Sequence, residues 1–173
     1  MSRLLCGTAL ALCLALPAQA VVIDLGVNPT SSTGTFSTAA GGDGSGPFED
    51  QVTFELVGGP QFVTIANATN VFPRTTDFIT DWEASIYLQV GPIGGADDVL
   101  LFGPQDAAPC VTIANCQQVG GTAILGAGTY YAEFTGIGGG TSGYGGNIST
   151  FAVPGPTIGG LGSLVKVVAS LLH

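Results

Sequence analysis

The sequence predicts an all-β fold, an antiparallel β-sandwich of jelly-roll type, and three observations support that prediction. Short segments alternate apolar and polar residues with a period of two, the pattern of strands that bury one face. Glycine-rich turns such as GGDGSGP and GPIGGADD separate these segments. Helical periodicity is nearly absent before the C-terminal tail. A closed up-and-down arrangement of the same strands is the alternative.

Residues 1–20 are predicted to be a secretory signal peptide and are left out of the fold. Arg3 supplies a basic start, and an apolar run extends from Leu4 to Leu16. Ala18-Gln19-Ala20 supplies the small residues that a signal peptidase requires. We expect cleavage after Ala20, so that Val21 begins the exported chain. A buried N-terminal helix is the alternative.

The β-sandwich domain is predicted over residues 21–152, because about 130 residues suit one domain with one core. In the segment DQVTFELV, the side chains of Val52, Phe54 and Leu56 fall on one face. Other segments repeat this alternation. The expected strands are Val21–Leu25, Gly34–Thr38, 50–57, Gln61–Ala68, 83–90, Val99–Phe102, Gly121–Leu125, 128–136 and Gly146–Val153. The aromatic residues expected in the core are Phe54, Phe62, Trp82 and Phe134.

The exported chain keeps two cysteines, Cys110 and Cys116, because Cys6 and Cys13 leave with the signal peptide. Two cysteines in an exported protein normally pair. We therefore expect a disulfide that closes the short loop CVTIANC. A redox or metal-binding pair is the alternative.

Composition excludes several classes of function. The formal net charge is −9, and loss of Arg3 with the signal peptide lowers it to −10. Nucleic acids and anionic membranes are therefore poor partners, since phosphate binding needs clustered Lys and Arg. The sole histidine is His173, which removes Ser-His-Asp triads and ordinary zinc catalysis. The paired carboxylates of an acidic domain are too common to indicate a glycosidase, and we expect no enzyme activity.

Two kinds of binding site are alternatives to a purely structural domain. Asp43, Asp97 and Asp98 lie in loops that could fold around Ca²⁺, although flexible loops with solvating charges are the favoured interpretation. We therefore expect no cofactor, with calcium as the alternative. A carbohydrate-binding face would need exposed aromatic side chains beside acidic and amide groups. The aromatic candidates are Trp82, Tyr87, Tyr131 and Tyr144.

Motifs along the chain resemble those of the bacterial PEP-CTERM exported proteins, in the subgroup named for an FxDxF motif. The segment FEDQVTF places Phe48, Asp50 and Phe54 at the start of a strand, and a Gly-Ser hairpin segment follows at 125–149. The middle of the chain also resembles the pre-peptidase C-terminal type of β-sandwich. The resemblance implies export to the surface or extracellular matrix of a Gram-negative bacterium, a role in adhesion or in association with exopolysaccharide, and processing by an exosortase.

The resemblance implies that residues 153–173 are a degenerate sorting tail. Val153, Pro154, Gly155 and Pro156 match its opening motif, with glycine in place of the usual glutamate, and the terminal arginine cluster is absent. Seventeen residues follow that motif, whereas a membrane span needs about twenty. Lys166 also lies at their centre, where a charge is costly. We expect a short one-sided helix that contacts the membrane only transiently, with an end that packs on the sandwich or is frayed as the alternative.

Overall fold

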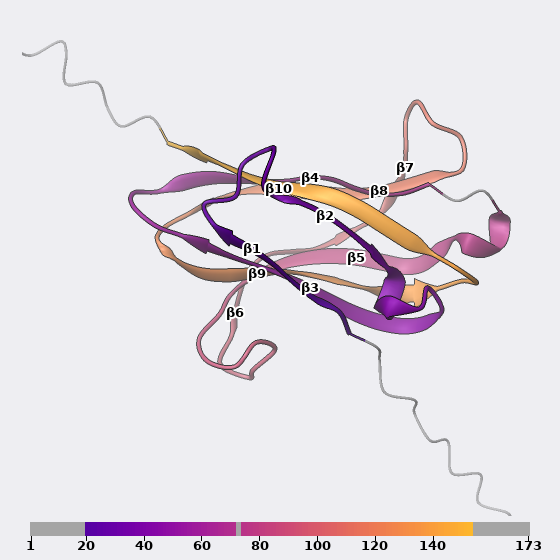
Figure 1. Ribbon diagram of the computed structural model, residues 1–173, viewed down its shortest axis with the longest axis horizontal. Helices are drawn as coiled ribbons and strands as arrows, with labels where there is room; N and C mark the ends of the chain where they lie inside the picture. Colours follow the sequence, from indigo (N-terminus) through magenta and orange to yellow (C-terminus); the bar gives the residue numbers. More distant parts are fainter. Residues whose placement is uncertain (1–19, 72–73, 154–173) are drawn as a thin grey trace, which may run out of the picture.

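The computed structural model describes residues 20–71 and 74–153, which form two packed β-sheets (Figure 1). Sheet A has the order β1-β3-β9-β5-β6, with bounds of Val22–Val27, Gly46–Leu56, Gly128–Gly138, Ile79–Leu88 and Val99–Asp106. Sheet B has the order β2-β10-β4-β8-β7, with bounds of Thr35–Ala39, Gly143–Ala152, Gln61–Val71, Cys116–Leu125 and Ala108–Pro109. The predicted all-β sandwich is confirmed.

Most consecutive strands lie in different sheets, so the chain passes repeatedly across the core. The chain changes sheet at each step from β1 to β5, and again at the steps from β6 to β7, from β8 to β9 and from β9 to β10. The β5–β6 and β7–β8 connections stay within one sheet. Strand β1 pairs in parallel with β3, and the other pairings are antiparallel. This alternation is typical of a jelly roll and excludes an up-and-down arrangement, in which consecutive strands are neighbours.

The helical elements among the described residues are two 3₁₀ turns, η1 at Ala40–Gly42 and η2 at Thr75–Asp77. The short helix predicted at the C-terminus lies outside the described residues. Within residues 20–71 and 74–153, no helix has the length and apolar character needed to cross a membrane.

The core lies between the sheets and is built from the inward side of the alternating strands. Strand β3 shows the pattern. Its inward face carries buried apolar side chains, those of Phe48, Val52, Phe54 and Leu56, whereas Glu49 and Glu55 on its outward face are exposed. Phe54, Trp82 and Phe134 are buried, as predicted. The other large core side chains include Ile65, Ile79, Ile86, Tyr130, Tyr144 and Ile148.

The prediction that Phe62 is a core residue is wrong, since its side chain is 41% exposed. Phe62 points outward from β4, and its register partners are Phe151 on β10 and Ile124 on β8. These three side chains form one cross-strand row on the outer face of sheet B, and all are exposed. These cross-strand neighbours bury part of the Phe62 side chain, although it lies outside the core.

Candidate functional site

The outward-facing side chains of β3, β9 and β5 bring together a group of polar and aromatic residues. We call Glu49, Gln51, Tyr87, Tyr131 and Glu133 the outer patch. The register aligns Gln51 with Glu133, and it aligns Tyr131 with Tyr87. Because β9 lies between β3 and β5, these side chains are neighbours on the outer face of sheet A.

The two tyrosines of the outer patch stack on each other. Their ring centroids are 5.0 Å apart, and the ring planes differ by 10°. Tyr131 is 2% exposed although it points away from the core, while Tyr87 is half-buried. The Tyr131 hydroxyl donates to Oδ2 of Asp98 over 3.0 Å. Burial raises the pKa of Tyr131, and the Asp98 carboxylate raises it further, so the phenol stays neutral.

The loop between β5 and β6 covers Tyr131, and Asp98 holds that loop together. Oδ1 of Asp98 accepts the amide of Val90 over 2.7 Å, and Oδ2 accepts the amide of Gly95 over 3.1 Å. The Val90 amide is the main cause that holds the pKa of Asp98 below its ordinary value, although partial burial acts in the opposite direction. Both carboxylate oxygens are therefore occupied as hydrogen-bond acceptors in the loop.

The calcium candidates do not converge. Asp43 accepts the amide and the hydroxyl of Ser45 through Oδ1, in the turn after η1. Asp98 belongs to the β5–β6 loop, and Asp97 beside it is exposed. In the described ranges, no group of three or more His, Cys, Asp or Glu side chains is placed to hold a metal ion.

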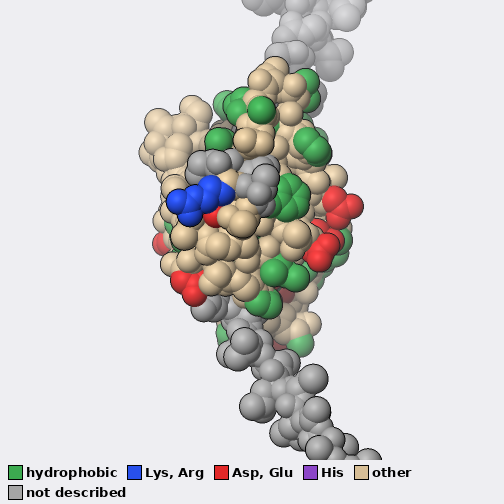
Figure 2. Space-filling view, turned by 90° about the vertical axis from the view of Figure 1, so that its right-hand side faces the viewer, with side chains coloured by type: hydrophobic (Ala, Val, Ile, Leu, Met, Phe, Trp, Pro, Cys, Tyr) green, Lys and Arg blue, Asp and Glu red, His purple; other side chains and the backbone are tan. Residues whose placement is uncertain are grey.

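The carboxylates of the outer patch lie in an environment without a nearby cation. Burial raises the pKa of Glu133, and the Glu49 carboxylate raises it further, while hydrogen bonds with Gln51 and Tyr87 lower it. Among the described residues, Arg74 is the sole Lys or Arg. Figure 2 shows a basic side chain, in blue, on the face of the molecule that it draws. The patch thus offers hydrogen-bond acceptors in excess of donors.

The motif residues Phe48, Asp50 and Phe54 all point into the core. The Phe48 ring stacks on the Tyr144 ring at 6.0 Å, and the Phe54 ring stacks on the Tyr130 ring at 5.6 Å. The Asp50 side chain is 1% exposed. These residues therefore stabilise the sandwich and do not form an accessible binding face.

Three donors reach the buried Asp50 carboxylate from separate parts of the chain. Oδ1 accepts the amide of Val21 over 2.8 Å. Oδ2 accepts the amide of Gly41 over 3.1 Å and the hydroxyl of Tyr144 over 3.0 Å. Burial raises the pKa of Asp50, and the three donors lower it in the order Gly41, Val21, Tyr144. The sequence carried a signal for this, because Asp50 has the same period-two register as Phe48 and Val52.

Three of the four aromatic candidates for a carbohydrate-binding face are buried. Trp82 and Tyr144 belong to the core, and their ring centroids are 5.3 Å apart. Tyr131 lies under the β5–β6 loop. Tyr87 alone of the four keeps a partly exposed ring. An open platform made of several aromatic rings is therefore excluded for these residues, and any aromatic contact depends on Tyr87.

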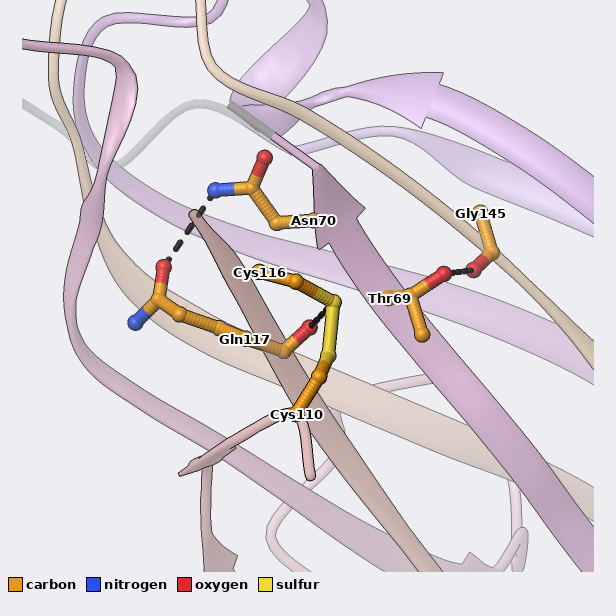
Figure 3. The surroundings of a disulfide bond; sticks show 6 residues. All are labelled: Thr69, Asn70, Cys110, Cys116, Gln117 and Gly145. Carbon is orange, nitrogen blue, oxygen red and sulfur yellow. Dashed lines mark hydrogen bonds between the residues drawn. A yellow bond between two sulfur atoms is a disulfide. The ribbon is translucent and has the colours of Figure 1, made fainter. Parts of the chain in front are cut away.

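The disulfide between Cys110 and Cys116 is confirmed, and it closes the loop between β7 and β8 (Figure 3). The amide of Cys110 donates to the carbonyl of Cys116 over 3.0 Å. The next residue, Gln117, bonds both backbone groups of Ile79 in sheet A, at 3.0 Å through Oε1 and 2.7 Å through Nε2. Asn70 donates to the same Oε1. This buried link between the sheets was not predicted, because a lone glutamine gives no pattern in the sequence.

A groove of about 450 Å³ lies where β6 passes β8. It presents amide, hydroxyl and carboxylate groups, and the Phe102 ring lies across Gly121 beside it. Its polar lining residues are Thr64, Gln105, Asp106, Gln118 and Thr122. This groove supplies hydrogen-bonding groups without an aromatic side chain in its lining.

The carboxylates that are neighbours in the sequence differ in their surroundings. Glu49 and Asp50 are consecutive strand residues, so one points outward and the other into the core. Asp81 is exposed, with φ of 50°, and Asp98 accepts hydrogen bonds within its loop.

The sorting-motif residues Pro154, Gly155 and Pro156 lie outside the described residues, and Val153 ends the described chain.

No protein-family model matches the sequence, and no curated protein is significantly similar to it. Among solved structures, the chain is similar to the pre-peptidase C-terminal domain of collagenase from Bacillus anthracis, with 17% sequence identity and a TM-score of 0.34. That similarity covers 79% of this chain and 98% of the other. The fold assignment therefore depends on the sheet order given above.

Proposed function

We propose that this protein is exported and acts, without catalysing a reaction, as a component of the cell surface or extracellular matrix that binds a neutral exopolysaccharide. The single observation that carries the binding role is the outer patch, in which a partly exposed tyrosine lies beside two carboxylates and an amide. Export is supported by the predicted signal peptide and by the Cys110–Cys116 disulfide, since disulfides persist in oxidising compartments.

The chemistry of the outer patch suits a sugar. The C–H face of a pyranose packs against an aromatic ring such as Tyr87, and its hydroxyls donate to carboxylate oxygens. Glu49 and Glu133 supply such acceptors, and the buried Gln51 donates to Oε1 of Glu49 over 3.4 Å, which positions that carboxylate. A polymer of uronic acids would be repelled, because the chain has a formal net charge of −9. The expected ligand is therefore rich in hydroxyls and uncharged.

Affinity electrophoresis tests the binding role. The native protein is run through gels that contain a neutral glucan, a neutral galactomannan or the polyuronate alginate. We expect retardation by a neutral polymer and none by alginate. Tyr87→Ala and Glu133→Gln should each abolish most of the retardation, whereas Glu55→Gln, which changes an exposed carboxylate farther along β3, should not.

Two controls separate the outer patch from the alternatives. Gln105→Ala removes an amide from the groove beside β8, and we expect it to leave retardation unchanged. We propose no calcium requirement, because both oxygens of Asp98 already accept hydrogen bonds, so retardation should persist in a chelator. Retardation by alginate alone, or loss in Gln105→Ala with none in Tyr87→Ala, contradicts the assignment.

We also propose that the tail sorts the exported protein to the cell surface through an exosortase-like enzyme, as the family resemblance implies. The described chain ends at Val153, whose amide donates to the carbonyl of Pro60 over 3.1 Å. A deletion of residues 154–173 keeps that contact and removes none of the described residues. We expect the deletion to move the protein from the envelope fraction to the medium. Equal partitioning of the deleted and full-length chains would remove the sorting role.

A further inference from the structure

The backbone around Val21 is fixed to the neighbouring strand on both sides. The amide nitrogen of Val21 donates to Oδ1 of Asp50 over 2.8 Å, and the carbonyl of Val21 accepts the amide of Gln51 over 2.8 Å. Val21 immediately precedes β1, which is an edge strand of sheet A. The residue before β1 therefore places its backbone nitrogen against a carboxylate that is almost completely buried.

That nitrogen is also the one that signal-peptide cleavage would release. The predicted scissile bond joins Ala20 to Val21. Hydrolysis adds one water across this bond: a carboxylate forms on Ala20, and the nitrogen of Val21 becomes an amino group that is protonated at neutral pH. Before cleavage, Asp50 receives only neutral donors. After cleavage, the same position carries a positive charge.

We propose that the α-ammonium of Val21, formed by cleavage of the Ala20–Val21 bond, is the counterion of Asp50 and completes the fold of the exported domain. This assigns a role to the aspartate of the FEDQVTF segment: it receives the new N-terminus. The proposal rests on the proposed export, because export is what exposes the chain to a signal peptidase.

The surroundings of Asp50 favour this pair. Three donors already converge on the carboxylate, from the residue before β1, from η1 and from β10, so its position is fixed before cleavage. The titratable group that faces the Asp50 carboxylate is the neutral Tyr144 hydroxyl. The groups that shift the pKa of Asp50 include no charged side chain. Ala20 is exposed, so the bond to be cut lies at the surface of the domain. An ion pair held in place by neighbouring structure is stronger than one between two mobile surface side chains.

Three forms of the chain test the ion pair: one that begins with a free amino group at Val21, one extended by Ala20, and one that is acetylated at Val21. We expect the α-amino pKa of the first form, followed by NMR, to exceed its ordinary value of about 7.7–8.0 by roughly one unit or more. The extended form should show an ordinary value. The melting temperature at pH 7 should be highest for the first form.

The pH dependence has a defined sign. An ammonium lowers the pKa of its partner carboxyl, and the carboxylate raises the pKa of the ammonium. The extra stability of the Val21 form should therefore be lost as pH falls through the Asp50 pKa, and lost again as pH rises through the α-amino pKa. The acetylated form should lack the loss at high pH.

Two variants complete the test. In Asp50→Asn, the three forms should melt at the same temperature, and the α-amino pKa should be ordinary. In Asp24→Asn, which neutralises an exposed carboxylate on β1, the differences should persist. If Asp50→Asn does not fold, the comparison of the three forms with Asp50 intact decides the question alone. An ordinary amino pKa with equal melting temperatures overturns the ion pair.

The host protein tests the processing step separately. N-terminal sequencing of the exported protein should return Val21. A different first residue overturns the assignment of the cleavage site and leaves the engineered Val21 form as the test of the ion pair. N-terminal sequencing therefore tests the processing, whereas the α-amino pKa and the melting temperatures test the ion pair, so the two failures give different results.

Discussion

Replacement of Tyr144 by phenylalanine removes one of the three donors to the buried Asp50 carboxylate and leaves the aromatic ring in place. The hydroxyl lies 3.0 Å from Oδ2, and both side chains are buried. A hydrogen bond to a charged group contributes about 1.5–3 kcal/mol, and a neutral one about 0.5–1.5 kcal/mol. We expect Tyr144→Phe to lower the free energy of unfolding by about 2 kcal/mol at pH 7.

Tyr130→Phe is the matched control. The Tyr130 hydroxyl donates over the same distance, 3.0 Å, but its acceptor is the neutral carbonyl of Gly126. We expect a loss of about 1 kcal/mol for this variant. Guanidinium unfolding followed by the fluorescence of Trp82, the single tryptophan and a buried residue, measures both losses.

The pH dependence separates a charged acceptor from a neutral one. Burial raises the pKa of Asp50, and removal of the Tyr144 donor raises it further. The deficit of Tyr144→Phe should therefore be complete above that pKa and should decrease toward the Tyr130→Phe value as pH falls through it. Equal losses for the two variants at pH 7, or a Tyr144→Phe deficit that does not change with pH, would refute the reasoning.

Three further predictions concern other parts of the sandwich. Replacement of Cys110 and Cys116 by serine should lower the free energy of unfolding by about 2–3 kcal/mol. A reductant should lower that of the wild type by the same amount and should leave that of the variant unchanged. Gly34→Ala should cost about 1–3 kcal/mol or more in denaturant unfolding, because the new methyl group would overlap a backbone carbonyl of β10, whereas Gly59→Ala meets no atom within 4 Å and should be neutral. Glu133→Gln should raise the melting temperature at pH 7, and this gain should disappear as pH falls through the raised pKa of Glu133; a gain that persists in acid would contradict the burial argument.

The strands could be predicted from the sequence because each buries one face. Val52, Phe54 and Leu56 alternate with polar residues, and the structure buries all three. The position of Phe62 could not be predicted, since an alternating strand does not reveal which of its two faces meets the other sheet. The pairing of the cysteines needed only their number and the expected compartment.

The outer patch could be predicted only in part. Alternation placed Tyr131 and Glu133 on the same face, but nothing in the sequence indicated that the β5–β6 loop would cover Tyr131. That cover depends on Asp98, which lies more than thirty residues away in the sequence. The composition of the loop had indicated Asp98 only as a calcium candidate. The burial of Asp50 was the opposite case, because its register with Phe48 was visible in the sequence and only its three donors were not.

The order of strands also determines when this chain can fold. Strand β9 lies between β3 and β5 in sheet A, and β10 lies between β2 and β4 in sheet B. Both of these strands come from the last part of the domain, so neither sheet is complete until residues 128–152 are present. A chain that emerges N-terminus first from a ribosome or a membrane pore must therefore remain open along most of its length. Pairings between strands so distant in sequence also slow folding, which favours passage through a translocation channel before the domain closes.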